Sequence, residues 1–280
     1  MNQKMKDNNH YIVFDWAIKH ILRDKSNFNI LEGLLTVLLD EKLTIEEILE
    51  DRDEEMNRKY NFEHVNIIAK NSLGEIFIVE IKLLECYCYL CRLLEYNKSK
   101  TISKKINKET QRSDAKIKYY INIAYFDIGE GDDYLYHGQN HLLGKNKGDE
   151  LQLSEEDCFG IEMPQSMNSS QEYYILRLTS FEDEPKTPIE EWMEYLKNGR
   201  INPDTTVPGL QEAMQRLNVL DMTVKDNNVY INYLYEKTYE EDVLTTSYEK
   251  GYAKGLELAR KMKAQGLSEE DIQRIIGMEP

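Results

Sequence analysis

The sequence has few of the features that would place a protein in a membrane or outside the cell. None of its 280 residues lies in an uninterrupted apolar run of the roughly 18 residues that a membrane span needs. The opening stretch MNQKMKDNNH has no apolar core of the kind found in a secretory signal. Of only four cysteines, Cys86, Cys88 and Cys91 crowd into one segment, which is not the pattern of a secreted disulfide framework. We therefore expect a cytoplasmic protein with free thiols.

The sequence also lacks an excess of positive charge. Its formal net charge is −16, so the chain as a whole repels a polyanion such as DNA, and any contact with nucleic acid must be local. One basic stretch lies at 97–118, where eight lysines and arginines stand against two acids. A solvated helix face and a local DNA contact both fit this stretch. Our candidate DNA contacts are Lys98, Lys100, Lys104, Lys105 and Arg92, although a structural ion pair explains Arg92 equally well.

The first part of the chain mixes helical and strand patterns. Apolar residues at helical spacing predict helices at 13–22, 30–39 and 87–106. Alternating and β-branched runs predict one hairpin at 65–82, a second hairpin at 119–138 and a strand at 173–178. With 41% hydrophobic and 31% charged residues, the composition is that of a globular protein of one or two domains.

The second half of the chain is predominantly helical in pattern. Proline just inside a start and glycine at an end predict a helix at 187–199, and further helices are expected at 207–220, from about 226 to Gly266, and after Ser268. We expect a domain at 10–180, a helical extension at 181–225, and a long helix with a helix-turn-helix-like tail at 226–280. The long helix allows a homodimer.

The first hairpin, VNIIAKNSLGEIFIVEIK at 65–82, has a register that the turn predicts. If Ser72, Leu73 and Gly74 form a three-residue loop with Gly74 in the left-handed conformation, Asn71 and Glu75 close it. Counting back places three apolar pairs on one face of a half-buried hairpin: Val65 with Ile81, Ile67 with Val79 and Ala69 with Phe77. The opposite face then carries Asn66 opposite Glu80, with Lys82 beside them.

These three polar residues suit a hydrolytic metal site. A hard cation such as Mg²⁺ takes oxygen ligands, and opposed Cβ atoms about 5 Å apart allow Asn66 and Glu80 to share one. The cation can polarise a phosphodiester and lower the pKa of a bound water, while Lys82 orients or activates that water. An acid, one spacer and a lysine also occur on ordinary surface strands, so the motif by itself leaves both interpretations open.

The wider sequence resembles the PD-(D/E)XK nuclease superfamily, and specifically the PD-(D/E)XK nuclease family transposases, which are related to recombination-promoting nucleases. The resemblance is carried by FDWAIKHILRDKSNFNILEGLLTVLL at 14–39, the hairpin at 65–82, YINIAYFDIGEGDDYLYHG at 120–138, EYYILRL at 172–178 and GLELARKMKAQGLSEEDIQRIIGM at 255–278. It implies an α/β, restriction-endonuclease-like core with a central mixed sheet flanked by helices. It also implies magnesium- or manganese-dependent DNA cleavage and a role in recombination or transposition.

The resemblance assigns roles to particular residues. Glu32 matches the family's acid on an early helix, Glu80 matches the second acid of the motif, and Lys82 matches its third position. Asn66 stands where the family carries aspartate, which weakens the hold on a cation because the charge is lost. The predicted metal ligands are Glu80, Asn66 and the carbonyl of Ile81.

Two hypotheses follow from the asparagine at position 66. Either the lost charge leaves a protein that binds Mg²⁺ poorly and cleaves DNA slowly or not at all, or Glu32 or, less favourably, Glu63 supplies the missing charge. The competing class of function is a catalytically inactive protein that keeps the fold and binds DNA or associates with itself.

Overall fold

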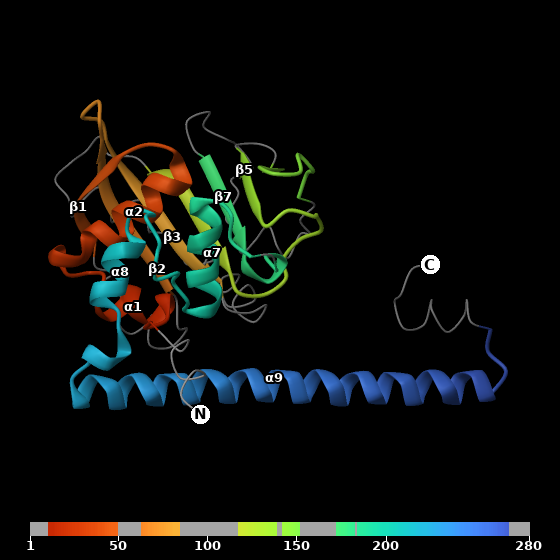
Figure 1. Ribbon diagram of the computed structural model, residues 1–280. Coiled ribbons are helices and arrows are strands. Elements are labelled where there is room, and N and C mark those ends of the chain that lie inside the picture. The colour runs from red at the N-terminus through yellow and green to blue at the C-terminus, as the bar shows by residue number, and fades with distance from the viewer. Residues whose placement is uncertain are drawn as a thin grey trace. The chain divides into compact units, whose positions relative to one another are not determined.

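A computed structural model describes residues 11–49, 63–84, 117–138, 142–151, 172–182 and 184–268 (Figure 1). The chain divides into two compact units, Met1–Asp221 and Met222–Pro280, which are described separately below. The first unit contains the sheet and the second contains a long helix.

The first unit is built on a mixed sheet of seven strands in the order β1-β2-β3-β4-β7-β5-β6. The strands are β1 (Leu43–Leu49), β2 (Glu63–Asn71), β3 (Ile76–Leu84), β4 (Ile117–Ala124), β5 (Leu135–Gly138), β6 (Leu143–Gly144) and β7 (Glu172–Arg177). Neighbouring strands are antiparallel from β1 to β3, parallel from β3 through β4 to β7, and antiparallel again from β7 to β6. The expected α/β fold with a central mixed sheet is confirmed.

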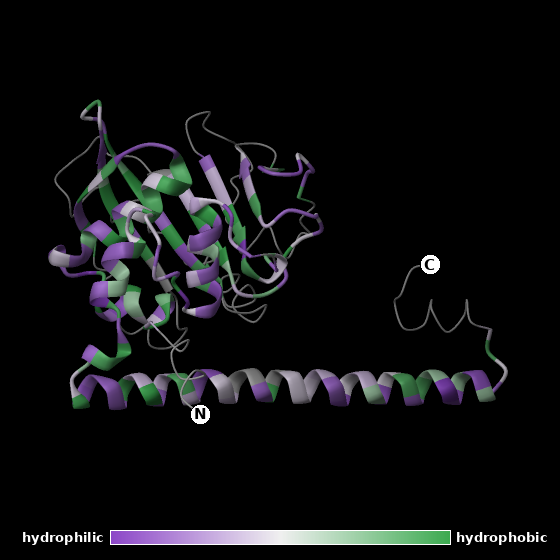
Figure 2. Cartoon of the chain, viewed as in Figure 1, coloured by the Kyte–Doolittle hydropathy of each residue, from purple (hydrophilic) through white to green (hydrophobic). Residues whose placement is uncertain are grey.

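Four helices lie together on one side of the sheet in Figure 1: α1 (Phe14–His20), α2 (Phe28–Leu39), α7 (Pro188–Asn198) and α8 (Leu210–Arg216). The rings of Phe14 and Tyr195 meet edge to face, and the Tyr195 hydroxyl donates a 2.9 Å hydrogen bond to the Ile12 carbonyl. Residues far apart in the chain thus pack together in one apolar layer against the sheet. Figure 2 shows hydrophobic ribbon in the strands of this sheet and in its helices. The helices expected at 13–22, 30–39, 187–199 and 207–220 are confirmed. The second begins two residues earlier than expected, at Phe28, and the fourth is limited to Leu210–Arg216.

Capping interactions fix the ends of α7, and one close backbone contact fixes the approach of α2 to α8. Thr187 caps α7 in a capping box with Glu190, and Gly199 ends the helix in the left-handed conformation with φ 63°. At Gly33 on α2, an added Cβ would lie 2.4 Å from the Cα of Gly209, at the start of α8. The absence of a side chain at Gly33 therefore sets how closely α2 and α8 approach.

The sheet corrects two expectations from the sequence. The hairpin at 119–138 is wrong, because β7 lies between β4 and β5 and pairs with both. The hairpin at 65–82 is not half-buried, because residues 77–84 of β3 are buried on both faces. Strand patterns report which residues prefer extended backbone, but the choice of neighbour depends on packing of the whole chain. Strands β1 and β6 were not anticipated.

The second unit contains α9 (Val224–Ala264). Thr223 caps its start, accepting a hydrogen bond from the Asp226 backbone amide, and Gly266 with φ 88° follows its end, as the sequence predicts. Figure 2 shows hydrophobic and hydrophilic ribbon alternating along the whole helix. The short helix expected after Ser268 lies outside the described residues. Within the part of the chain that the structure describes, no helix has the length and apolarity of a membrane span.

Candidate active site

The hairpin of β2 and β3 has the register that the sequence predicts. Gly74 is left-handed with φ 84°, the Asn71 amide donates to the Glu75 carbonyl at 3.1 Å, and the Gly74 amide donates to the Asn71 carbonyl at 3.0 Å. The Asn71 side chain locks the turn, since its Oδ1 accepts from the amides of Leu73 and Glu75. The pairs Val65–Ile81, Ile67–Val79 and Ala69–Phe77 form as expected.

This register brings three of the predicted site residues together. Asn66 on β2 pairs directly with Glu80 on β3, and Lys82 lies two residues further along β3. The Lys82 Nζ is 3.5 Å from the Glu80 Oε1. Exposed fractions of 7% for Asn66, 6% for Glu80 and 5% for Lys82 show that all three are buried. Two buried opposite charges stabilise each other, whereas either one alone would be strongly unfavourable.

The Asn66 carboxamide has an unused acceptor. Its Oδ1 is buried and has no hydrogen-bond partner among the described residues. Such an oxygen is unfavourable unless something contacts it, so it marks a position where a cation or a water fits. With the Glu80 carboxylate opposite, the oxygens present are of the type that a hard divalent cation takes. No cluster of three or more histidines, cysteines, aspartates and glutamates suited to a metal occurs in the described residues.

Glu32 lies elsewhere in the first unit. It is half-buried on α2, and its Oε1 accepts a 2.7 Å hydrogen bond from the Ile45 amide on β1. Ile45 pairs with Ala69, three residues along β2 from Asn66. At about 3.3 Å per residue, the two rows of the sheet are about 10 Å apart. The structure thus joins Glu32 to β1, and the role of this acid in catalysis stays a prediction.

A fourth polar residue, which the sequence reasoning missed, lies on the same face. Asn122 on β4 pairs with Lys82 in the parallel β3–β4 ladder and is 1% exposed. Its Nδ2 donates a 3.4 Å hydrogen bond to the Tyr174 carbonyl. Its Oδ1 is buried without a partner among the described residues, as for Asn66. An asparagine inside the apolar run YYINIA is the signal that could have identified it.

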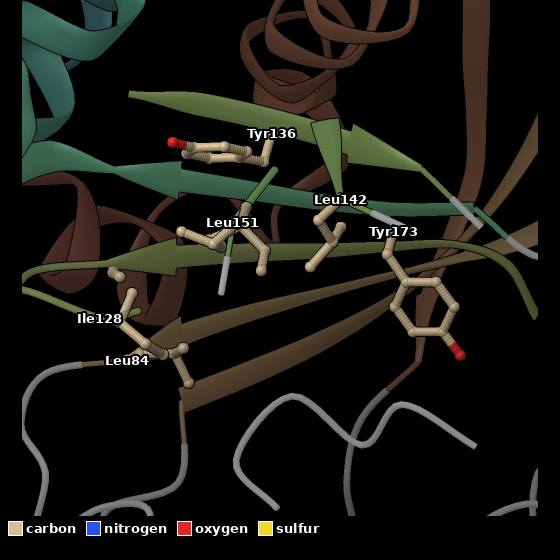
Figure 3. Close-up of a cluster of buried hydrophobic side chains, with 8 residues drawn as sticks. Leu84, Ile128, Tyr136, Leu142, Leu151 and Tyr173 are labelled. Atoms are coloured by element: carbon tan, nitrogen blue, oxygen red, sulfur yellow. The ribbon is translucent and has the colours of Figure 1, made fainter. Parts of the chain in front are cut away.

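An apolar cluster borders these polar residues. Figure 3 shows side chains from strands and loops of the first unit packed together: Leu84, Ala124, Ile128, Tyr136, Leu142, Leu151, Tyr173 and Ile175. Leu84 follows Lys82 by two residues on β3, and Ile175 pairs with Asn122 across the β4–β7 ladder. The polar residues therefore end where the cluster begins, and little water reaches that boundary.

A separate buried polar cluster has a structural role. Asp133 is fully buried and accepts hydrogen bonds from the Asn146 amide at 2.6 Å, the Asn146 Nδ2 at 2.9 Å and the Lys147 amide at 2.9 Å. Burial alone would raise the pKa of Asp133, but these bonds outweigh it and lower the pKa below its usual range. The carboxylate is fully engaged in holding the loop after β6, which leaves no oxygen for a ligand.

Several predicted site residues lie outside the described residues. These are all the candidate DNA contacts: Arg92, Lys98, Lys100, Lys104 and Lys105. The helix expected at 87–106 lies outside them as well. Glu63 belongs to β2 and its backbone pairs with Leu83, away from the Asn66–Glu80 pair. Ile81 is fully buried on β3, and because its side chain is a hydrocarbon, the predicted ligand is its main-chain carbonyl.

Comparison with known proteins gives one match. The model of a family described as PD-(D/E)XK nuclease family transposase matches residues 12–246. This range includes the seven described strands, the helices α1, α2, α7 and α8, and Asn66, Glu80, Lys82 and Asn122. Neither the curated proteins nor the solved structures gave a match.

Proposed function

The chain belongs to the PD-(D/E)XK nuclease family transposases, and we propose that it hydrolyses phosphodiester bonds of DNA with Mg²⁺ or Mn²⁺ at Asn66, Glu80 and Lys82. Membership places the protein in a superfamily of nucleases that use divalent metals, with DNA as the partner that a transposase family implies. The observation that carries the proposal is the buried pair of Asn66 and Glu80, with an unpartnered carbonyl oxygen beside a buried carboxylate.

Each residue of the candidate site has a distinct role in the proposed reaction. Glu80, the Asn66 Oδ1 and the Ile81 carbonyl would hold the cation, which would polarise the phosphodiester and lower the pKa of a bound water. Lys82 supplies an ammonium that orients the attacking water or stabilises charge on the phosphate. The apolar cluster that borders these residues limits the access of bulk water on that side, which strengthens these interactions.

Two observations support an impaired enzyme. Asn66 brings no charge to the cation, and Lys82 already neutralises Glu80, with Nζ and Oε1 3.5 Å apart. A divalent cation must displace that ammonium, so its binding is weak and cleavage is slow. The alternative is a DNA-binding or self-associating protein without activity, in which the Glu80–Lys82 pair only stabilises the fold. A role in transposition or recombination and a cytoplasmic location stay predictions.

Plasmid nicking tests the proposal. Purified protein with 10 mM Mn²⁺, a concentration on the order of that needed to fill a weak site, should nick supercoiled DNA slowly. Glu80→Gln should remove the nicking, whereas Glu75→Gln, a change of the same type at the exposed turn of the same hairpin, should leave it intact. Equal nicking by the wild type and Glu80→Gln would assign the activity to a contaminant and refute the proposal.

We also propose that two copies associate through α9 in antiparallel orientation. Its first half, 224–243, carries two lysines and five acids, while its second half, 244–264, carries five basic residues and two acids. Antiparallel pairing therefore sets opposite charges against each other. Large side chains are exposed along the helix, among them Tyr235, Tyr239, Tyr248 and Tyr252. A helix gains stability by covering such groups.

Sedimentation of charge-reversed variants tests this association. The wild type should sediment as a dimer of twice its 33.0 kDa mass. Replacing Lys250, Lys254 and Arg260 with glutamate should give monomers, because acids then face acids. Adding lysine at Glu236 and Asp242 to the same chain should restore the dimer. A wild type that is monomeric at about 100 μM would refute the association.

A further inference from the structure

Asn122 has a buried acceptor that the architecture of the sheet does not use. The side chain is 1% exposed, its Nδ2 bonds the Tyr174 carbonyl, and its Oδ1 has no partner among the described residues. An isoleucine in place of Asn122 on this interior strand would avoid the unfavourable burial of an unsatisfied oxygen. An unsatisfied oxygen at such a position points to a donor that arrives in another state of the site.

The ladder limits which donor can arrive. On one side of Asn122 the paired residue is Ile175 on β7, which is part of the apolar cluster and has no polar side-chain atom. On the other side the paired residue is Lys82 on β3. Adjacent strands are about 4.8 Å apart, so the flexible lysine chain can bring its ammonium to the carboxamide. Besides Asn122 itself, Lys82 is the one described residue in this row of β3, β4 and β7 whose side chain carries a donor.

One partner of Lys82 is the group that a cation would occupy. The Lys82 ammonium lies 3.5 Å from the Glu80 Oε1, which is long for a charge-assisted hydrogen bond. A cation on Glu80 would repel the ammonium and compete for the carboxylate oxygens. The buried Asn122 Oδ1 on the neighbouring strand, unpartnered among the described residues, is an acceptor that the repelled ammonium can reach.

We propose that Asn122 is a positioning residue for Lys82, whose ammonium moves from Glu80 to the Asn122 Oδ1 when a divalent cation occupies Glu80. The cation-dependent part rests on the proposed function, whereas the contact between Asn122 and Lys82 does not. The move leaves the ammonium beside the cation site and two residues from Glu80, where it can still face the attacking water. It also explains why an amide oxygen is kept unbonded at the edge of an apolar cluster.

A thermodynamic cycle without metal or DNA tests the contact. Glu80→Gln removes the carboxylate charge, so in this background Lys82 should already bond Asn122. Asn122→Leu, a change to a residue of similar size, is made in two backgrounds: Glu80→Gln, and Glu80→Gln/Lys82→Met. It should lower the folding equilibrium constant about tenfold more in the first background, because only there is a hydrogen bond to a charged group lost. Asn122→Asp, which keeps an acceptor, should not lower it. Equal effects of Asn122→Leu in both backgrounds, measured by urea unfolding, would overturn the proposal.

Titration calorimetry with Mg²⁺ tests the cation-dependent part on the full chain with Glu80 intact. Asn122→Leu should weaken Mg²⁺ binding about tenfold, since the displaced ammonium has no acceptor. Asn27→Leu is the matched control, because Asn27 is also buried with an unpartnered Oδ1 among the described residues but lies beside α2. It should lower stability without changing Mg²⁺ affinity. Equal Mg²⁺ affinity of Asn122→Leu and the wild type would overturn this part.

The two measurements separate the two proposals. A wild type that binds no Mg²⁺ refutes the proposed function and with it the cation-driven move. The unfolding cycle still decides whether Asn122 receives Lys82. A cycle without coupling overturns the contact even if Mg²⁺ binds and DNA is cleaved.

Discussion

Asn66→Asp should change metal affinity and metal-free stability in opposite directions. The substitution places a second carboxylate directly opposite Glu80. The Lys82 ammonium, which contacts Glu80, would then face two carboxylates. Without metal, two carboxylates about 5 Å apart repel by about 3 kcal/mol at an effective dielectric constant of about 20. We therefore expect the metal-free variant to be less stable than the wild type at pH 8.

The same charge attracts a cation strongly. A carboxylate and a divalent ion about 4 Å apart between charge centres attract by about 2 kcal/mol even at the dielectric constant of bulk water, which corresponds to about 30-fold in affinity. With Asn66 only 7% exposed, the effective dielectric constant is lower than that of water, so 30-fold is the lower bound of the expected gain. Plasmid nicking should rise with it.

Calorimetric titration with Mg²⁺ and urea unfolding with and without Mg²⁺ measure both effects. Asn66→Leu should bind Mg²⁺ more weakly than the wild type and be at least as stable without it, because an unpartnered buried oxygen is removed. Asn27→Asp, which places a new charge beside α2, should leave Mg²⁺ affinity unchanged. If Asn66→Asp binds Mg²⁺ no more tightly than the wild type, the assignment of this residue pair as the cation site is refuted.

Three further predictions concern the scaffold, each measured by urea unfolding. Gly33→Ala should lower stability by about 3 kcal/mol, because its Cβ would meet the Gly209 backbone at 2.4 Å. Gly251→Ala on α9, where nothing lies within 4 Å of the added Cβ, should instead stabilise the helix. Thr187→Ala should lower stability by about 1 kcal/mol through loss of the α7 cap. Because the pKa of Asp133 is lowered, its contribution is present above about pH 4 and is lost as the pH falls through its folded-state pKa; Asp133→Asn should be less stable at pH 7 and lose less stability on acidification. A variant with the wild-type dependence on pH would refute the last of these.

The features that the sequence predicts correctly depend on interactions between residues close in the chain. The register of Asn66 and Glu80 follows from a three-residue loop with Gly74 in the left-handed conformation, since loop length fixes every later pair of a hairpin. The bounds of α7 follow from Thr187, Pro188 and Gly199, because caps act within one turn. Family membership is a separate case, because its motifs are spread along the chain and are recognised from residue identity without any tertiary contact.

The features that the sequence does not predict depend on which strands and helices meet. Insertion of β7 between β4 and β5 breaks the expected hairpin at 119–138, because strand patterns do not specify a partner. Burial of β3 on both faces, and with it the burial of Glu80 and Lys82, depends on the layers packed over the sheet.

The same distinction holds for the candidate site. The sequence by itself determined the family and the relative positions of three candidate site residues, Asn66 opposite Glu80 with Lys82 alongside, because a single tight turn sets all three positions. Only the tertiary structure joined Glu32 to β1 and placed Asn122 beside Lys82. The parallel β3–β4 pairing joins strands separated by more than thirty residues, and no local interaction fixes the register across such a distance.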